Sequence, residues 1–224
     1  MRRFIVLGIL AFTSWGLATQ VTLVATDPAP LPGAQVGLTV SGVPAGAQLY
    51  WDFGGDGTVD QVTQAPAISY TVKAGYQEVA VQVHHQGKAI GSARIALSAD
   101  PFIGAYRQVV STKSGVIQVE IIVVARTHLF GVGVVEDVPI SWGIEVSEVT
   151  DNGSGIVGPN VNEEGQLEVG WMEMWPGDEV KLTYFLYPPS LSVEVRLLGI
   201  VSGYTPFPED KLIEVQIGGA VVVP

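Results

Sequence analysis

The chain has 224 residues, of which 47% are hydrophobic, so it is long enough to bury one or two substantial cores. It contains 27 glycines and 14 prolines, and its valine-rich runs favour an all-β fold. The formal net charge of −11 argues against nucleic acids and anionic membrane surfaces as partners. Cysteine is absent from the sequence, which excludes a disulfide framework, thiol catalysis and cysteine-ligated zinc.

The first 18 residues predict a secretory signal peptide. Arg2 and Arg3 precede an apolar stretch at residues 4–12, and residues 14–18 supply small side chains before a cleavage position after Ala18. The apolar stretch is shorter than the roughly 20 residues of a membrane helix, so a retained anchor is the weaker alternative. We therefore expect a secreted or cell-surface protein, extracellular or periplasmic, with no membrane span in the mature chain.

A boundary near residue 100 divides the remaining chain into two segments, residues 19–99 and 100–224. The first segment contains short runs in which apolar residues alternate with small or polar ones, and glycine- and proline-containing turns separate the runs. The alternating apolar positions are Val36, Leu38, Val40, Val79, Val81 and Val83. Short strands at this spacing predict a β-sandwich.

The most informative run of this segment is Leu-Tyr-Trp-Asp-Phe-Gly-Gly-Asp-Gly-Thr at residues 49–58. Side chains alternate along a strand, so Trp51 and Phe53 share one face and can both enter a core while Asp52 points away. The glycines tolerate positive φ and Asp56 can bond its own backbone, so we expect the strand to end there in a tight loop.

This run, followed by Tyr70 and by the Ala-Gly-Tyr turn at residues 74–76, resembles the PKD family of immunoglobulin-like β-sandwiches. That family usually has one glycine between the phenylalanine and the aspartate, and Gly55 is an additional residue here. The family occurs in surface and secreted proteins, so the resemblance implies a displayed module in preference to a catalyst.

The same acidic turn matches part of a calcium-binding loop. Asp52, Asp56 and Asp60 stand at the first, fifth and ninth positions of such a loop, where oxygen ligands surround the ion. Gly54 and Thr63 replace the ligands expected at the third and twelfth positions. The simpler interpretation is that the three acids cap and solvate the turn. Binding of Ca²⁺ is the alternative, and we expect no other cofactor.

The second segment repeats the strand pattern without repeating the sequence. Apolar residues alternate at residues 117–123, 140–146, 180–186, 193–197 and 213–217. No helix-sized window shows a 3.6-residue period. The predicted fold is therefore all-β, with two immunoglobulin-like β-sandwich domains in tandem, at residues 19–99 and 100–224, after the signal peptide at residues 1–18.

Part of the second segment is similar to immunoglobulin-like modules of the DUF11 class, which are appended to bacterial and archaeal envelope proteins. The residues that carry this similarity are Pro-Gly-Asp-Glu-Val-Lys-Leu-Thr-Tyr at 176–184, Leu-Gly-Ile-Val-Ser-Gly-Tyr at 198–204 and Ile-Gly-Gly at 217–219. The similarity implies a location in the cell envelope.

Aromatic side chains are the best candidates for recognition. Trp175 lies in a turn, and Phe185 and Tyr187 lie on the strand face opposite Tyr184 and Leu186. An exposed platform of Trp175, Phe185 and Tyr187 would stack on sugar rings or anchor a protein partner. Burial of these rings between the two domains is the more conservative alternative.

The sequence shows no pattern typical of an enzyme. A Gly-x-Ser-x-Gly nucleophile motif is absent, and the adjacent His84 and His85 face opposite sides of a strand. Acids are dense at residues 163–179, but solvation of a surface explains them more simply than a catalytic carboxylate pair. We predict a non-catalytic module for adhesion, envelope assembly, or protein or polysaccharide binding. A calcium-stabilised adhesion module and a secreted hydrolase or glycosidase are the alternatives.

The apolar C-terminus at residues 218–224 raises a further hypothesis. An apolar terminal strand can add to the open sheet edge of a neighbouring molecule, which would give self-assembly. The alternative is that this segment completes a sheet of its own chain.

Overall fold

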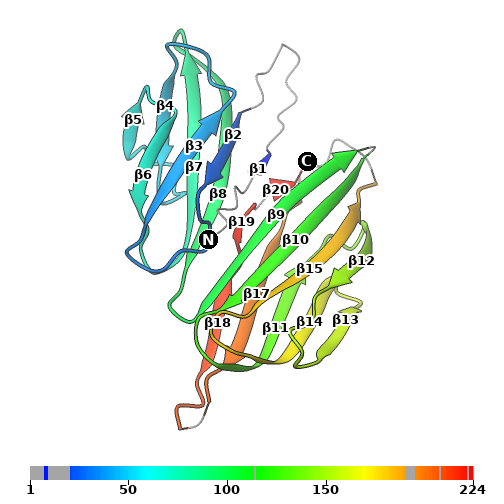
Figure 1. Cartoon of the computed structure of the whole chain (residues 1–224). Helices are drawn as coiled ribbons and strands as arrows, with labels where there is room; N and C mark the ends of the chain where they lie inside the picture. Colours follow the sequence, from blue (N-terminus) through cyan, green and yellow to red (C-terminus); the bar gives the residue numbers. More distant parts are fainter. Residues whose placement is uncertain are drawn as a thin grey trace.

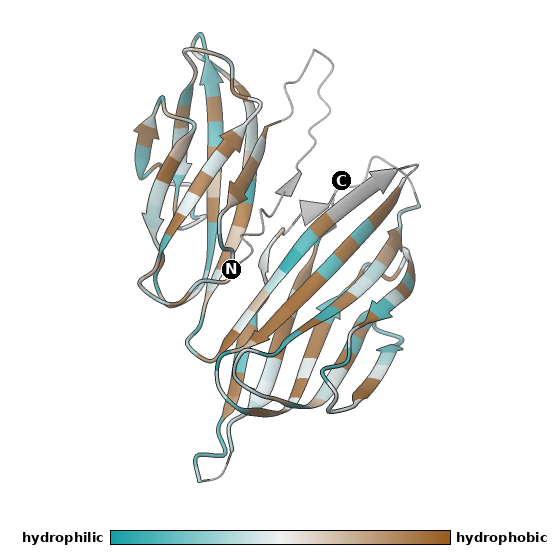
Figure 2. Ribbon diagram, viewed as in Figure 1, coloured by the Kyte–Doolittle hydropathy of each residue, from teal (hydrophilic) through white to brown (hydrophobic). Residues whose placement is uncertain are grey.

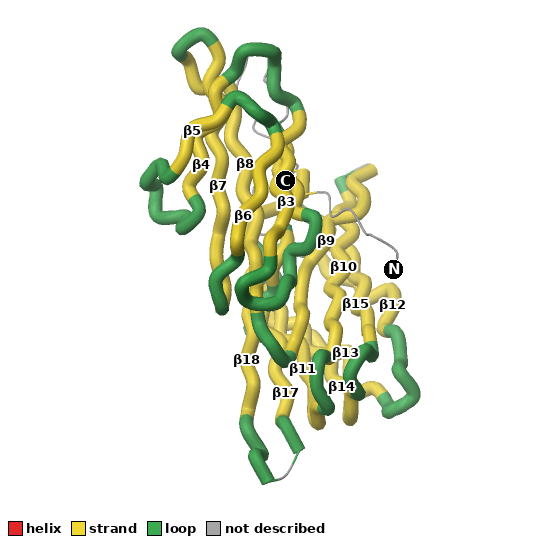
Figure 3. The backbone as a smooth tube through the Cα atoms, turned by 60° about the vertical axis from the view of Figure 1, so that its left-hand side comes forward, coloured by secondary structure: helices red, strands yellow, loops and turns green. Residues whose placement is uncertain are grey.

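The computed structural model describes residues 8–9, 21–113, 115–189, 195–206, 208–220 and 222–223. Every regular element in these residues is a β-strand, which confirms the all-β fold class (Figure 3). The predicted signal peptide lies outside the described residues, except for the short strand β1 (Gly8–Ile9), which pairs with β2 (Thr22–Ala25). The described residues include no helix that is long and apolar enough to cross a membrane.

The described strands form three larger sheets and one short pair. The N-terminal sheet has the order β1, β2, β3 (Gln35–Ser41) and β6 (Ala67–Thr71). The long sheet has the order β12 (Gly143–Val149), β15 (Glu179–Tyr187), β10 (Val116–Ala125), β9 (Ile103–Lys113), β19 (Gly218–Gly219), β8 (Lys88–Ala99), β7 (Gly75–His85), β4 (Gln48–Asp52) and β5 (Gln61–Thr63). The C-terminal sheet has the order β13 (Ile156–Val161), β14 (Gln166–Met174), β11 (Leu129–Asp137), β17 (Leu198–Tyr204) and β18 (Leu212–Gln216). The short pair is formed by β16 (Val195–Arg196) and β20 (Val222–Val223).

Figure 1 shows how these layers are arranged. Two clusters of apolar side chains fill the spaces between them. The first lies between the N-terminal sheet and the β8-β7-β4 part of the long sheet, and includes the fully buried Leu38 and Trp51. The second lies between the β15-β10-β9 part of the long sheet and the C-terminal sheet, and includes Ile121 and Val134. Hydrophobic and hydrophilic residues alternate along many strands (Figure 2), because successive side chains face opposite sides of a sheet.

The two sandwiches share one continuous sheet through β19. Gly219 pairs antiparallel with Ala96 of β8 and parallel with Arg107 of β9, so the terminal strand lies between the two halves of the chain. A side chain at Gly218 would place its Cβ 2.7 Å from the carbonyl oxygen of Pro28, so this approach requires glycine. The sequence predicted two sandwiches in series, and their common sheet is a feature that it did not predict.

The connection between β8 and β9 is held by side chains. One carboxylate oxygen of Asp100 accepts hydrogen bonds from the backbone N–H groups of Phe102 at 2.7 Å and Ile103 at 2.9 Å. The Arg126 guanidinium donates to the carbonyl oxygens of Asp100 and of Ala29, which precedes β3. Arg126 therefore ties the connection and the first sandwich to the second sandwich.

One strand of the second sandwich begins later than predicted. The sequence placed Ile140 and Trp142 on one strand face, but Ile140 is 77% exposed and β12 begins at Gly143. The Trp142 N–H donates to the Pro139 carbonyl at 2.9 Å and closes a turn there. This turn directs Ile140 into solvent, while Trp142 belongs to the second apolar cluster.

The C-terminal segment pairs with strands of its own chain. β19 lies between β8 and β9, and β20 pairs with β16. These pairings correspond to the alternative in which the segment completes its own sheet, and self-assembly through this strand stays a prediction.

Candidate functional site

Trp175 follows β14 directly and is 55% exposed. It opens a turn in which the Asp178 N–H donates to the Trp175 carbonyl at 2.9 Å and Gly177 has a φ of +94°. The Asp178 carboxylate accepts from the Trp175 N–H at 2.9 Å and from the Asn152 side-chain amide at 3.0 Å. These bonds fix the backbone that carries the exposed indole ring.

The indole of Trp175 stacks on the imidazole of His128, with ring centroids 3.8 Å apart and an interplanar angle of 11°. His128 Nε2 and Glu173 Oε1 form a hydrogen bond of 2.6 Å, and the His128 ring centroid lies 4.5 Å from that of Phe130. Phe130 pairs across the sheet with Tyr204 of β17. Phe130 and Tyr204 are 42% and 46% exposed. We call Trp175, His128, Phe130 and Tyr204 the aromatic surface.

Strand alternation explains why these rings gather. Leu129 and Met174 pair with each other and are both fully buried, so they face the core. Their neighbours in the chain, among them Phe130 and Trp175, must then face outward. The aromatic surface therefore lies at one end of the outer face of the C-terminal sheet.

The two other predicted binding residues, Phe185 and Tyr187, lie on β15 in the long sheet. Phe185 is half-buried, and the hydroxyl of Tyr187 donates to Glu145 Oε2 at 2.7 Å, a bond that raises the pKa of Tyr187. Six residue steps from Glu179 to Phe185 span about 20 Å of strand. Trp175 precedes the opposite end of β15, so the structure does not bring it together with Phe185 and Tyr187.

The three acids of the predicted calcium loop all bond to the backbone of their own turn. Asp52 is 9% exposed and accepts three backbone N–H groups of residues 54–57 at 2.8–3.3 Å. Asp56 accepts from the N–H two residues later at 2.8 Å, and Asp60 accepts from the Phe53 N–H at 2.7 Å. Within the described part of the chain, no three acidic or histidine side chains are grouped so that they could hold a metal. The contacts correspond to the capping interpretation, and calcium binding stays a prediction.

A buried polar network that the sequence analysis missed lies inside the second sandwich. Arg107 of β9 forms a two-bond ion pair with Glu136 of β11, with Nε–Oε1 and Nη2–Oε2 distances of 2.7 and 2.5 Å. The Tyr184 hydroxyl donates to Glu136 Oε1 at 2.9 Å, and Arg107 Nη1 donates to the carbonyl oxygen of Ala220 at 2.9 Å. The network thus joins both layers of the sandwich to the C-terminal segment.

Burial governs the acid–base behaviour of this network. It raises the pKa of the Glu136 carboxyl, although the charge of Arg107 opposes this effect. Burial alone would lower the pKa of Arg107, but the carboxylate of Glu136 reverses that change and raises it. Burial also raises the pKa of Tyr184 well above its ordinary value. Because Arg107, Glu136 and Tyr184 are fully buried, the network is inaccessible from solvent and its role is structural.

The sequence did contain a signal for this pair. Arg107 follows the inward positions Ile103 and Ala105 at a spacing of two, and Glu136 follows Val134 in the same way. A charged residue at an inward position in each of two strands predicts two buried charges, which proteins pair with each other.

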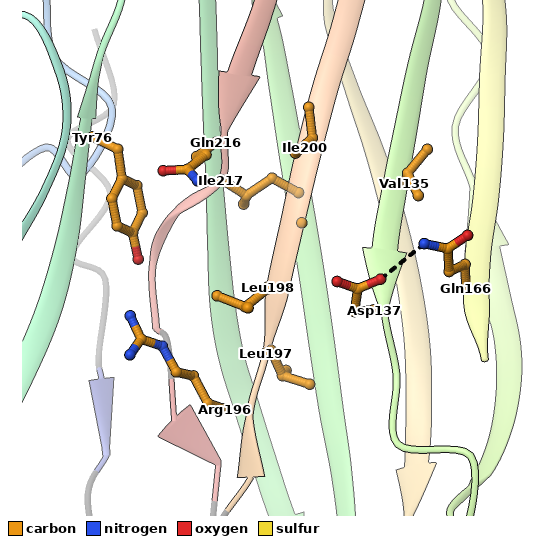
Figure 4. A pocket seen from close by; sticks show the side chains of 11 residues that line it. Tyr76, Val135, Asp137, Gln166, Arg196, Leu197, Leu198, Ile200, Gln216 and Ile217 are labelled. Carbon is orange, nitrogen blue, oxygen red and sulfur yellow. Dashed lines mark hydrogen bonds between the residues drawn. The ribbon is translucent and has the colours of Figure 1, made fainter. Parts of the chain in front are cut away.

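A pocket of about 270 Å³ lies where the first sandwich meets the outer face of the C-terminal sheet (Figure 4). Tyr76 of β7 lines it from the first sandwich, and residues of β11, β14 and β17 line it from the second. Figure 4 shows that the side chains of Tyr76 and Arg196 lie on one side of Leu198, and that of Asp137 lies on the other. The pocket therefore has two polar sides separated by an aliphatic floor.

No family model matches the chain, and no curated protein matches it. Among solved structures, the chain is similar to the major pilin SpaD from Corynebacterium diphtheriae (12% identity, TM-score 0.45), covering 87% of this chain and 61% of that one. It is also similar to BcpA, the major pilin subunit of Bacillus cereus (13% identity, TM-score 0.38), covering 79% and 64%. A third similarity is to the collagen adhesin of S. aureus (8% identity, TM-score 0.36), covering 92% and 94%. The chain spans less than two thirds of either pilin, and TM-scores this low assign it neither a family nor a function.

Proposed function

We propose that the chain is a non-catalytic binding module of a secreted or cell-surface protein and that its aromatic surface contacts the partner. The observation that carries the proposal is the state of Trp175, whose ring is 55% exposed yet stacked on His128 and anchored by its turn. A ring that is already fixed loses little conformational entropy on binding and can offer its apolar face to a partner.

The chemistry of the aromatic surface fits a neutral saccharide. Exposed ring faces can stack on the apolar faces of sugars, and Glu173 and His128 beside them can exchange hydrogen bonds with hydroxyl groups. The net charge of −11 disfavours an anionic polymer. The bound class is therefore proposed to be an uncharged polysaccharide of the cell envelope or extracellular matrix.

A protein partner is the second candidate, favoured by aliphatic side chains on the same sheet. Met172, Ile200 and Leu212 are 62%, 43% and 42% exposed. Leu212 pairs directly with Tyr204, so the apolar area continues beyond the four rings. Exposed apolar area of this kind is typical of protein interaction sites.

The non-catalytic part of the proposal is supported by the position of Glu136. Enzymes use carboxyl groups with a raised pKa as general acids when substrate can reach them. The raised pKa of Glu136 has another cause, because this carboxyl is enclosed in the core and paired with Arg107. The hydrolase alternative would instead require an accessible acid of this kind.

Co-sedimentation with insoluble polysaccharides tests the proposal. Cellulose and chitin, which are both uncharged, are incubated with the full chain, with Trp175→Ala and with Tyr187→Ala, an exposed aromatic residue outside the aromatic surface. We expect Trp175→Ala to weaken binding about tenfold, equivalent to about 1.4 kcal/mol, and Tyr187→Ala to leave it unchanged. Equal binding by the two variants would contradict the assigned surface. Capture of envelope proteins that depends on Trp175 would instead favour the protein partner.

Export is tested separately from binding. If the predicted signal peptide is removed, protein recovered from the culture medium or cell surface will begin at Thr19. N-terminal sequencing measures this directly. Recovery from the cytosol with Met1 still attached would contradict secretion.

A further inference from the structure

Aliphatic side chains form the floor of the pocket at the junction of the two sandwiches. Val135, Leu198 and Ile200 line it and retain 36%, 47% and 43% exposure. Val135 and Ile200 are directly paired across β11 and β17, so they form one continuous apolar strip. The pocket volume of about 270 Å³ suits a small ligand and is too small for an extended polymer.

One side of the pocket carries positive charge. Arg196 pairs with Glu78 Oε1, and the Tyr76 hydroxyl donates to the same oxygen at 3.2 Å. Arg94 Nη1 lies 3.9 Å from the other oxygen of Glu78, so two guanidinium groups share a single carboxylate. Arg196 has five N–H donors, and its contact with Glu78 engages Nη2. This side can therefore accept a ligand carboxylate.

Tyr76 holds the Glu78 carboxylate in place on the same side of the pocket. Burial raises the pKa of its hydroxyl, and the nearby Arg196 opposes that effect in part. The hydroxyl therefore keeps its proton at neutral pH and donates it to Glu78, while its oxygen can accept a hydrogen bond from a ligand.

The opposite side of the pocket carries negative charge. Asp137 Oδ1 accepts from the Gln166 side-chain amide at 3.1 Å. This bond holds the carboxylate in place, and Figure 4 shows the other oxygen of Asp137 turned toward Leu198. A ligand ammonium group above Leu198 would therefore meet an oriented anionic oxygen.

We propose that this pocket binds a small zwitterion with an aliphatic body, namely an aliphatic amino acid or a very short aliphatic peptide. Its carboxylate bonds to Arg196, its ammonium group bonds to Asp137, and its side chain covers Leu198 and Ile200. Each ligand charge meets a group of opposite charge, and the order of charges across the floor sets the ligand orientation. The site is distinct from the aromatic surface and does not depend on its function.

The position of the pocket has a consequence for stability. Tyr76 belongs to the first sandwich, whereas Asp137 and Leu198 belong to the second. A ligand that contacts all of them binds the assembled junction and not the unfolded chain, so it raises the melting temperature.

Calorimetric titration of the full chain with four probes tests the proposal. The probes are L-leucine, L-leucyl-L-leucine, N-acetyl-leucine without an ammonium group, and leucinamide without a carboxylate. We expect the two zwitterions to bind and to raise the melting temperature, and each blocked probe to bind at least about tenfold more weakly. Absence of both heat and thermal shift with millimolar zwitterions would overturn the proposal, as would equal binding of the blocked probes.

Two variants test which residue binds the ammonium group of the ligand and which binds its carboxylate. Asp137→Asn should weaken leucine about tenfold and leave N-acetyl-leucine unchanged, because that probe has no ammonium group. Arg196→Gln should weaken leucine and leave leucinamide unchanged. Lys88→Gln is the matched control, since it removes one positive charge from an exposed residue that does not line the pocket, and it should bind leucine normally. Should Arg196→Gln fail to fold, as judged by circular dichroism, Asp137→Asn still decides. An unchanged leucine affinity in Asp137→Asn would contradict the assignment.

Discussion

The two sandwiches differ in where they keep their polar groups. In the first, an apolar cluster fills the core, and the Trp51 indole N–H donates to the Thr63 hydroxyl at 3.0 Å. Asp52 lies at the edge of this sandwich and accepts hydrogen bonds from the backbone of its turn. In the second, the ion pair of Arg107 and Glu136 lies inside the core. Burying a charge pair fixes the position of the C-terminal segment, but it also makes the core sensitive to mutation. Removal of either partner leaves an uncompensated buried charge.

The largest loss of stability is expected from a mutation in the core of the second sandwich. Glu136→Gln should lower the free energy of unfolding by about 3–5 kcal/mol, because it leaves the Arg107 charge buried without its partner. The double variant Arg107→Met with Glu136→Leu removes both charges and should cost much less. Urea denaturation measures both. A single variant that costs no more than the double variant would show that the pair does not act as a unit.

The next effect concerns the strand that joins the two sandwiches. Gly219 has a φ of +83° and its missing Cβ would overlap the backbone of Arg107, so Gly219→Ala should cost about 2–4 kcal/mol from strain and overlap together. Gly33→Ala is the matched control, because Gly33 has a φ of +81° but no atom within 4 Å of a Cβ. It should cost about 1–2 kcal/mol.

Calorimetry shows whether β19 couples the sandwiches. We expect one thermal transition for the parent chain and two for Gly219→Ala, because the common sheet is interrupted at its centre. Equal losses of stability in the Gly219 and Gly33 variants would indicate that the overlap with Arg107 is relieved without disturbing the sheet.

A smaller loss of stability is expected in the acidic turn that follows β4 in the first sandwich. Asp52→Ala removes the acceptor of three backbone N–H groups and should cost about 1–2 kcal/mol, whereas Asp56→Ala removes the acceptor of one and should cost less. Melting curves with and without Ca²⁺ extend the measurement. A calcium-induced rise in melting temperature that Asp52→Ala abolishes would favour the calcium-stabilised alternative over capping alone.

The smallest effect is the pH dependence of the buried pair. Burial raises the pKa of Glu136 above its ordinary value of 4.5, so the folded chain holds this proton more tightly than the unfolded chain. The stabilisation is complete below the ordinary pKa and is lost as the pH rises through the raised value. The charge of Arg107 opposes the influence of burial and so reduces the effect. Unfolding free energies from about pH 4 to about pH 8 should show this decline in the parent chain and not in the double variant.

Particular residues show how far the sequence predicted the structure. Strand alternation placed Trp51, Val81 and Ile121 in cores because a two-residue period fixes the face of each side chain. The same period failed at Ile140, where a turn interrupts the strand. Prediction was therefore reliable within strands and unreliable where a strand begins.

The residues predicted to bind a partner show what strand alternation could not predict. The sequence named Trp175 as a candidate recognition residue, with burial between the domains as the alternative, and the structure shows it exposed. Its neighbours His128 and Tyr204 come from segments distant in the chain, and cross-strand pairing of β11 with β14 and β17 brings them together. Phe185 and Tyr187 are closer to Trp175 in sequence but belong to the other layer.

The all-β fold class, the acidic charge and the inward and outward faces of most strands follow from composition and local alternation, so they could be predicted without a structure. The tertiary structure alone decided which strands are neighbours. That choice placed Gly219 between β8 and β9, paired Arg107 with Glu136 and put Tyr76 beside Arg196 at the junction pocket. A local pattern can mark Arg107 and Glu136 as inward charges, but which distant strands become neighbours depends on contacts between residues far apart in the chain.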